Sequence, residues 1–347
     1  MKIQLSTRNR AYQFEAQSQE RILYAALHNG IDFPYECGSG TCGTCKARLI
    51  EGKIDDLWPE SPGRKHLKPD LGEFLMCQCV ARTDISIEAA SFVYAMDTGV
   101  CVPSTRTGVI QRSKLLARDV MALEIGLDEP CDFDAGQFMV MAMPSVSGYR
   151  AYSIVNFERQ ARKLDFLIKK KPGGGVSEWL FSGKPEGAAV DLYGPLGRAT
   201  FYPSIGKNIL CIAGGSGIAG MMSIISRACQ EHYFDQHQAH IYFGVRTMKD
   251  AFFLSELSQF KREFPDTLHV TVALSDEEVS PSVRDSYPAL QFDRGLIHEV
   301  AINQMKGKCH NVRAYLAGPP PVVDAAIRML LLQEKLTTDN IRYDKFS

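Results

Sequence analysis

Four cysteines are the residues whose spacing in this chain points most directly to chemistry. Three of them stand in the run Cys37-Gly-Ser-Gly-Thr-Cys42-Gly-Thr-Cys45, and the fourth, Cys77, follows at a distance. A C-x4-C-x2-C run with a remote fourth cysteine is a spacing that holds a [2Fe–2S] cluster. The glycines of the run allow a tight loop whose N–H groups point at sulfur. The spacing therefore predicts a [2Fe–2S] centre with Cys37, Cys42, Cys45 and Cys77 as ligands.

Two other interpretations of these cysteines are a zinc knuckle and a set of unrelated buried thiols. Zinc sites usually pair two C-x2–4-C or H-x3–5-H halves, and the sequence has no second half of this kind. Cys79 lies two residues after Cys77 and competes with it for the fourth position. The remaining cysteines have no ligand spacing: Cys101, Cys131, Cys211, Cys229 and Cys309.

A second group of residues predicts a site for a phosphate-bearing ligand. Arg150-Ala-Tyr-Ser153 follows a predicted strand, and Lys171-Pro-Gly-Gly-Gly-Val-Ser177 comes about twenty residues later. The second stretch is a glycine turn that leads into a helix, where free N–H groups and the helix dipole favour an anion. An arginine adds bidentate recognition of a phosphate. Alternatively, these residues form a salt bridge, a core tyrosine and an ordinary turn.

A third stretch, Ala213-Gly-Gly-Ser-Gly-Ile-Ala-Gly220, lies between a predicted strand and a predicted helix, which is where a phosphate loop belongs. It contains the spacing G-x-G-x-x-G. The dinucleotide fingerprint also requires an acidic residue at the end of the next strand, but that strand ends in Gly244-Val-Arg246. The sequence therefore lacks the acidic residue that the usual Rossmann fingerprint requires.

The elements that must position these residues change in character along the chain, which predicts a multidomain protein. Residues 1–95 indicate a small α+β unit around the cysteine run, and residues 96–104 indicate a linker. Residues 105–205 contain short strands that predict an antiparallel β-barrel. From 206 to 347, strands and helices alternate, which predicts an α/β nucleotide-binding domain with a parallel sheet. The expected helices of that domain cover residues 218–230, 250–264, 296–305 and 321–334.

The motifs together resemble the ferredoxin–NADP reductase superfamily, with a plant-type ferredoxin domain of β-grasp topology in front. Over its full length the chain is similar to the reductase components of bacterial aromatic-ring oxygenases. This resemblance implies FAD, a [2Fe–2S] cluster and NAD(P)H as cofactors. In it, Arg150 pairs with the FAD pyrophosphate, Tyr152 stacks on the flavin and Ser153 lies near the reacting flavin atom. The implied FAD-binding residues are Arg150, Ala151, Tyr152, Ser153, Gly174, Gly175, Val176, Ser177 and Phe346.

The resemblance also assigns the nucleotide half. Ser153, Ala317 and Phe346 occupy the positions nearest hydride transfer, and the aromatic ring of Phe346 would cover the flavin until nicotinamide displaces it. Three acidic residues after Ser275, at 276–278, oppose a 2′-phosphate, so NADH is favoured over NADPH. The implied NAD-binding residues are Gly214, Gly215, Ser216, Gly217, Gly220, Arg246, Asp250, Ser275, Gly318 and Pro319.

Two positions depart from the family pattern. Gly220 stands where the pattern has proline, and Ala317 where it has cysteine. Both fall in the nicotinamide half and put hydride transfer from NAD(P)H in question. Two functions follow. The first is an NADH-dependent ferredoxin or oxygenase reductase of aromatic degradation. The second is a redox-sensing regulator with impaired NAD(P)H reactivity, similar to the ferredoxin-reductase-like regulatory flavoprotein of tetralin degradation, which acts through a transcription-factor partner.

Composition argues against a nucleic-acid-binding, a membrane-spanning or a disulfide-rich protein. The net charge of −1 over 347 residues gives no basic footprint for direct nucleic-acid binding. No apolar run reaches membrane-spanning length, and ten cysteines fit a reducing compartment better than a disulfide framework. We therefore expect a cytoplasmic monomer whose partner is a ferredoxin, an oxygenase component or a transcriptional regulator.

Overall fold

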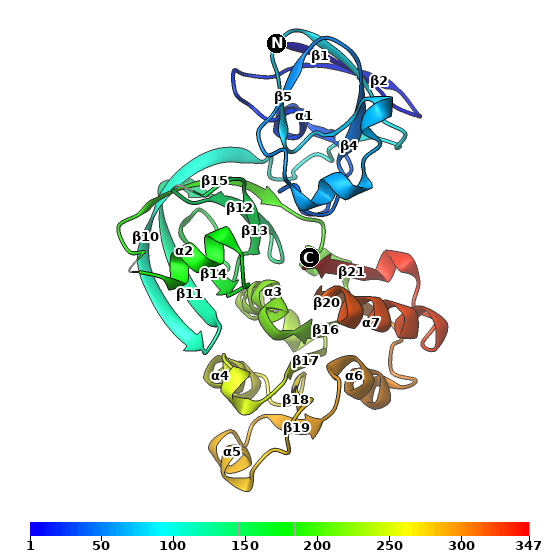
Figure 1. The fold of residues 1–347 in the computed structure, drawn as a ribbon. Coiled ribbons are helices and arrows are strands. Elements are labelled where there is room, and N and C mark those ends of the chain that lie inside the picture. The colour runs from blue at the N-terminus through cyan, green and yellow to red at the C-terminus, as the bar shows by residue number, and fades with distance from the viewer. Residues whose placement is uncertain (145, 184, 347) are drawn as a thin grey trace.

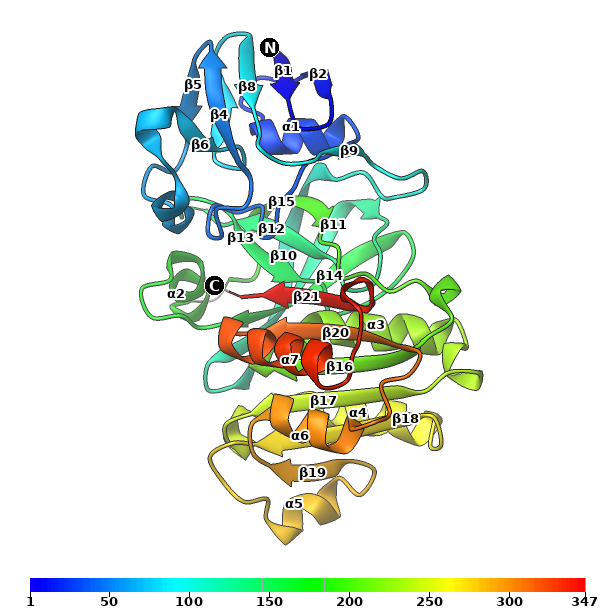
Figure 2. The same ribbon diagram turned by 90° about the vertical axis from the view of Figure 1, so that its right-hand side faces the viewer.

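The computed structural model describes residues 1–144, 146–183 and 185–346, and their elements form three successive units (Figures 1 and 2). The N-terminal unit lies at one end, the barrel in the middle and the C-terminal α/β unit at the other end. The C-terminal strand returns to the middle of the molecule, next to the barrel. The C-terminus therefore lies in the middle of the molecule, whereas the N-terminus lies at the outer end of the N-terminal unit.

The N-terminal unit is a five-stranded sheet with one helix packed against it. Its strand order is β2-β1-β8-β4-β6, and β1 runs parallel to β8 while its other neighbour is antiparallel. Alternating residues such as Ile3, Leu5, Ile85 and Ile87 point into the core and are buried. The elements are β1 (Lys2–Ser6), β2 (Ala11–Glu15), α1 (Ile22–His28), β3 (Ile31–Asp32), β4 (Lys46–Glu51), β5 (Ile54–Asp56), β6 (Glu73–Leu75), β7 (Cys79–Ala81), β8 (Ile85–Glu88) and β9 (Tyr94–Ala95).

The middle unit is a six-stranded antiparallel sheet in the order β13-β12-β15-β10-β11-β14. An isolated bridge between Ile154 and Phe166 joins its two outer strands, so the sheet closes into a barrel, as the short apolar runs predict. Closure removes both sheet edges and buries the inward-facing side chains. The elements are β10 (Ser104–Ala117), β11 (Val120–Cys131), β12 (Phe138–Ala142), β13 (Arg150–Ser153), β14 (Ala161–Lys169), α2 (Gly175–Phe181) and β15 (Ala189–Leu196).

The C-terminal unit is a six-stranded parallel sheet in the order β19-β18-β17-β16-β20-β21, with helices on both faces. Its central strands are continuous apolar runs because both of their faces are covered. The elements are β16 (Asn208–Gly214), α3 (Ile218–Gln230), β17 (Ala239–Val245), α4 (Leu254–Glu263), β18 (Leu268–Leu274), α5 (Pro281–Ser286), β19 (Gln291–Arg294), α6 (Ile297–Met305), β20 (Val312–Gly318), α7 (Pro320–Leu332) and β21 (Ile341–Lys345).

The sequence-based helix boundaries of the α/β unit agree with the structure to within two residues, except at one N-terminus. The helix expected from residue 250 begins at Leu254, because Thr247 and Asp250 form a capping box around a separate 3-10 turn, Met248–Asp250. The short outer strands β19 and β21 were not expected from the sequence.

Side chains from neighbouring units interlock. Tyr24 of α1 stacks on Tyr193 of the barrel with ring centroids 3.8 Å apart, and the Tyr193 hydroxyl donates to the Tyr24 carbonyl at 3.0 Å. On the other side of the barrel, Arg227 of α3 donates to Asp134 Oδ1 at 2.9 Å, and both side chains are at least nine-tenths buried. These contacts hold the three units in one arrangement.

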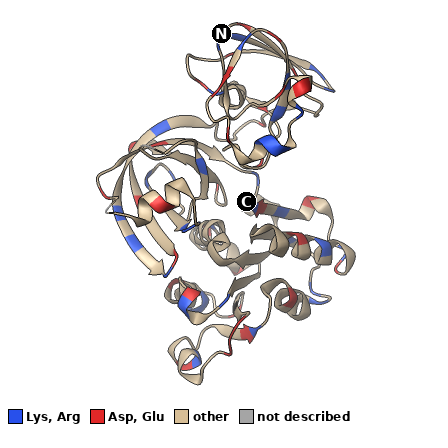
Figure 3. Ribbon diagram, viewed as in Figure 1, with Lys and Arg blue, Asp and Glu red and all other residues tan. Residues whose placement is uncertain are grey.

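Charged residues of both signs are distributed over all three units (Figure 3). This distribution accords with the net charge of −1. In the part of the chain that the structure describes, no helix combines the length and apolarity that crossing a membrane requires.

Candidate functional site

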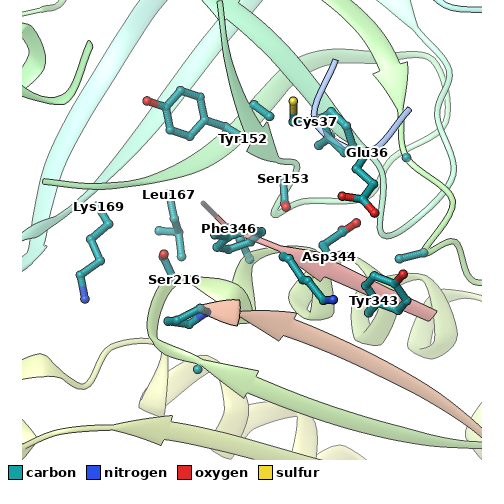
Figure 4. A pocket seen from close by; sticks show the side chains of 18 of the residues that line it. Glu36, Cys37, Tyr152, Ser153, Leu167, Lys169, Ser216, Tyr343, Asp344 and Phe346 are labelled. Atoms are coloured by element: carbon teal, nitrogen blue, oxygen red, sulfur yellow. The ribbon is translucent and has the colours of Figure 1, made fainter. Parts of the chain in front are cut away.

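One large cleft, about 1560 Å³ in volume, receives residues from all three units. The cysteine loop lines it with Cys37, the barrel with Tyr152, and the α/β unit with Ser216. Figure 4 shows these side chains around a common space, with Phe346 near its centre. The cleft therefore brings together the three motifs that lie far apart in the sequence.

The four cysteines predicted as cluster ligands form two pairs. The side chains of Cys37 and Cys42 are hydrogen-bonded to each other, as are those of Cys45 and Cys77. Two thiols per pair fit a two-iron rhomb, in which each iron takes two cysteine sulfurs. Among the described residues, no three His, Cys, Asp or Glu side chains converge on a site for a single metal ion. The pairing of the thiols is the arrangement that a two-iron cluster requires.

The loop around Cys37 directs N–H groups at its sulfur. The backbone N–H groups of Ser39, Thr41 and Cys42 each donate to Cys37 Sγ at 3.4 Å. The hydrogen bond from the Cys42 side chain and these N–H donors lower the pKa of Cys37 well below that of an ordinary thiol, although burial opposes them. A stabilised thiolate is the form that binds iron.

Glycines are required in this loop for room as well as for conformation. Gly40 and Gly43 have φ values of 87° and 80°, and a Cβ on either would lie 2.8 Å from the side chain of Gln78 or His66. Gln78 Nε2 also donates to Cys77 Sγ at 3.4 Å. The same close packing that excludes a Cβ brings donors to the sulfurs. The residues present fit a [2Fe–2S] cluster.

The predicted flavin residues Arg150, Ala151, Tyr152 and Ser153 form strand β13, and all four line the cleft. Arg150 is half-buried, and this desolvation lowers its pKa from the ordinary value. Burial raises the pKa of Tyr152, which keeps its hydroxyl neutral. Ser153 is buried and lies beside Phe346 and Asp344 in Figure 4. The strand thus presents one cation, one aromatic ring and one hydroxyl to the same space.

The glycine turn after β14 leads into α2, with Gly174 as its N-cap and Gly175 as its first residue. The N–H groups of this first turn have no partner within the helix and are available to an anion. The Ser177 hydroxyl accepts from Lys171 N at 3.0 Å and lies 3.0 Å from the Gly174 carbonyl. Ser177 therefore closes the turn with its side chain. Gly174, Val176 and Ser177 line the cleft as a preformed cradle, whereas Gly175 does not line it.

The glycine loop of the α/β unit lies at the C-terminal end of β16. Gly214, Gly215 and Ser216 line the cleft, whereas Gly217 packs behind them, where a Cβ would lie 2.4 Å from the Ala317 carbonyl oxygen. Gly220 is buried in the first turn of α3. A Cβ there would meet Ser153 Cβ and Gly136 O at 3.7 Å, which is ordinary contact. In this loop, Gly214 and Gly215 therefore face the cleft, whereas Gly217 allows close packing against Ala317.

The ends of strands β17, β18 and β20 hold the other predicted nucleotide residues. Arg246 is exposed, and it lines the cleft together with Asp250, Ser275 and Pro319. Ala317 is 2% exposed, and it and Gly318 lie below the cleft surface.

Asp250 is occupied by structural contacts. Burial would raise its pKa, but hydrogen bonds from Thr247 and the charge of Arg118, 2.8 Å away in the barrel hairpin, lower it. Asp250 therefore ties the α/β unit to the barrel in addition to any contact with a ribose.

The C-terminal strand β21 and the residue that follows it, Phe346, line the cleft. Phe346 is 36% exposed, and its backbone N–H donates to Gly318 O at 3.0 Å. Asp344 faces Glu36, the residue before Cys37, in Figure 4. Burial, with a smaller contribution from the charge of Glu36, raises the pKa of Asp344 to about 7.

Several cleft residues were missed from the sequence. Lys169, Lys170 and Lys171 line the cleft immediately before the glycine turn, and a run of three cations next to a phosphate cradle was a usable signal. Trp58 and Asp344 also line it. No sequence pattern connects these two residues with β13, because only the tertiary fold brings them there.

Three family models match successive parts of the chain. The 2Fe-2S iron-sulfur cluster binding domain matches residues 7–82, the oxidoreductase FAD-binding domain residues 107–201, and the oxidoreductase NAD-binding domain residues 211–328. Each match contains the motif on which the corresponding cofactor was predicted.

Relatives match over nearly the whole chain. The ferredoxin–NAD(P)+ reductase CarAd of Metapseudomonas resinovorans is 34% identical, with 95% of each chain covered. The ferredoxin–NAD(+) reductase component of the alkene monooxygenase system of Xanthobacter autotrophicus is 33% identical, over 96% of this chain and 97% of the relative.

Among solved structures, a ferredoxin reductase in carbazole 1,9a-dioxygenase has a TM-score of 0.82 and 31% identity, covering 100% of this chain and 99% of that one. The Amycolatopsis cytochrome P450 reductase GcoB has a TM-score of 0.79 and 25% identity, covering 99% and 98%. With the cluster loop, the flavin strand and the nucleotide loop on one cleft, the chain belongs to the ferredoxin–NAD(P)+ reductase family, in the type that carries its own 2Fe-2S domain.

Proposed function

We propose that this protein is the reductase component of an oxygenase system and delivers electrons to a ferredoxin or oxygenase partner. As a family member, the chain transfers electrons from NAD(P)H through FAD to a [2Fe–2S] cluster. A flavin supplies the chemistry that joins a two-electron hydride donor to one-electron carriers. The observation that carries the proposal is the common cleft, which joins the flavin strand, the nucleotide loop and Cys37 of the cluster loop.

The chain's own residues have distinct roles in this proposal. Cys37, Cys42, Cys45 and Cys77 hold the cluster. The FAD pyrophosphate is bound by Arg150 and the Gly174–Ser177 turn, and Ser153 and Phe346 bound the place where hydride passes. The nucleotide is bound by Gly214, Gly215, Ser216, Arg246, Ser275 and Pro319.

NADH is the proposed donor. Carboxylates follow β18 at positions 276–278, and the Ser275 hydroxyl already donates to Asp276 Oδ1 at 2.6 Å. A 2′-phosphate at this strand end would face like charge. Tighter binding of NADPH than of NADH would overturn this preference. We also propose that the protein works as a monomer in the cytoplasm, where reducing conditions keep the cluster thiols available.

Anaerobic titration of the purified protein with NADH, then with NADPH, tests the proposal. We expect stoichiometric NADH to bleach both the flavin and the cluster bands. Cys42→Ser should keep NADH-driven bleaching of the flavin but lose electron delivery to an added one-electron acceptor protein, whereas Cys229→Ser, a change in α3 outside the cleft, should keep both. Bleaching by dithionite but by neither nucleotide would reject the reductase function and favour a redox-sensing role.

A further inference from the structure

A tryptophan of the N-terminal unit lies on the arginine of the flavin strand. The guanidinium carbon of Arg150 is 4.2 Å from the ring centroid of Trp58, a cation–π distance. The ring also covers the backbone before the strand, because a Cβ on Gly148 would lie 2.6 Å from Trp58 Cε3. Gly148 has a φ of 74°, so the close approach and the conformation both require glycine. Trp58 thus reaches across the boundary between two domains.

The loop that carries Trp58 is tied to both segments that supply cluster ligands. The Leu57 N–H donates to the carbonyl of Gln78, next to Cys77, at 2.8 Å. The Gly63 N–H donates to the carbonyl of Gly40, inside the cysteine loop, at 2.8 Å. Within the loop, the Trp58 N–H donates to Asp56 Oδ1 at 3.0 Å. The position of the indole ring is therefore set by the folded cluster region.

Arg150 has few other partners that could orient it. Its Nη1 donates to the carbonyls of Tyr149 at 2.9 Å and Ser147 at 3.4 Å, both in the loop just before β13. Within residues 1–144, 146–183 and 185–346, no carboxylate forms an ion pair with it. A long side chain without a fixed partner loses conformational freedom when it binds a ligand. The contact with the face of the Trp58 ring restricts the Arg150 side chain before a ligand binds, and so reduces the entropy that binding costs.

We propose that Trp58 is a positioning residue for FAD, which holds the Arg150 guanidinium with its free edge toward the pyrophosphate. The inference rests on the proposed role of Arg150 as the pyrophosphate ligand. Because the Trp58 loop is bonded to Gly40 and Gln78, FAD binding and the seating of the cluster domain are coupled. Coupling of this kind is reciprocal, so whatever displaces the cluster domain weakens FAD binding.

The test is the FAD dissociation constant of the full-length protein, stripped of flavin with its cluster intact. A cation–π contact of ordinary strength corresponds to about a 3- to 30-fold change in affinity. Trp58→Leu should weaken FAD binding by this factor, and Trp58→Tyr, which keeps an aromatic face, should restore most of it. Phe92→Leu changes a 55% exposed ring of the same domain, outside the cleft, and should leave the affinity unchanged. Visible circular dichroism of the cluster reports whether each variant is folded.

A double-mutant cycle separates this inference from the assignment of Arg150. If Trp58 acts through Arg150, Trp58→Leu should have no further effect in an Arg150→Met background. Unchanged FAD affinity in Arg150→Met alone would refute the assignment of Arg150 to the pyrophosphate. The role of Trp58 would be refuted, and that of Arg150 kept, if Arg150→Met weakened FAD binding but Trp58→Leu did not. Additive losses of FAD affinity in the double variant would have the same meaning. Trp58→Met provides the same comparison if the leucine variant loses its cluster.

Discussion

Replacing Arg227 by methionine should lower the stability of the protein far more than breaking a surface ion pair does, because Arg227 forms a buried ion pair between the barrel and the α/β unit. The Arg227 guanidinium donates to Asp134 Oδ1 at 2.9 Å, Phe201 O at 2.8 Å and Glu231 Oε1 at 2.7 Å. Its side chain is only 5% exposed. Methionine keeps most of the apolar stem but leaves the buried Asp134 charge with the Tyr202 hydroxyl as its remaining side-chain donor, at 2.8 Å.

Breaking a buried ion pair in this way costs about 3–5 kcal/mol in the free energy of unfolding. For a unit of the size formed by the barrel and the α/β domain, that corresponds to a fall in Tm of about 6 to 20 °C. The double variant Asp134→Asn with Arg227→Met should recover part of the loss, because no uncompensated buried charge remains. A larger fall in Tm for Arg227→Met than for the double variant would therefore show that the uncompensated charge of Asp134 causes the loss.

Differential scanning calorimetry of the FAD-loaded protein measures the effect. The matched control is Lys163→Met, which breaks an ion pair with Glu124 at 3.3 Å in which the lysine is 57% exposed. Surface pairs of this kind contribute less than about 1 kcal/mol. If Arg227→Met and Lys163→Met lowered Tm equally, or if the double variant were less stable than Arg227→Met alone, the argument from burial would be refuted.

Three further predictions concern the site itself. Cys77→Ser should abolish the visible spectrum of the cluster and Cys79→Ser should retain it, because Cys77 pairs with Cys45; the opposite spectra would make Cys79 the ligand. Asp344→Asn should raise Tm by about 4 °C at pH 8 and by clearly less at pH 5. The folded-state pKa of Asp344 is raised to about 7, so the folded protein binds the extra proton and loses stability as pH rises from about 4 to 7; an equal change in Tm at both pH values would contradict this. Gly220→Ala should stabilise α3 by about 0.5–1 kcal/mol, because a Cβ there meets nothing closer than 3.7 Å; a lower Tm would show that the small contact with Ser153 is strained.

Local sequence determined the motifs and the order of the three units. The spacing of Cys37, Cys42 and Cys45 is local because one tight loop must supply three sulfurs, and the apolar runs of β16 and β17 are readable because both faces of those strands are buried. Helix α3 matches its expected range, Ile218–Gln230, because its apolar periodicity and its glycine loop lie next to each other in the chain.

Only the tertiary structure decided which residues meet. Strands β19 and β21 are outer strands whose pairing with β18 and β20 is set by the sheet, and their short mixed sequences carry little periodic signal. Trp58 and Arg150 are 92 positions apart, and Glu36 and Asp344 are 308 apart, as their numbers show. Contacts between units depend on how whole domains pack, and packing is a property of complementary surfaces that no local pattern of residues encodes. The chain's own sequence therefore identified the cofactors, whereas the packing of its domains determined how the cofactor sites are joined.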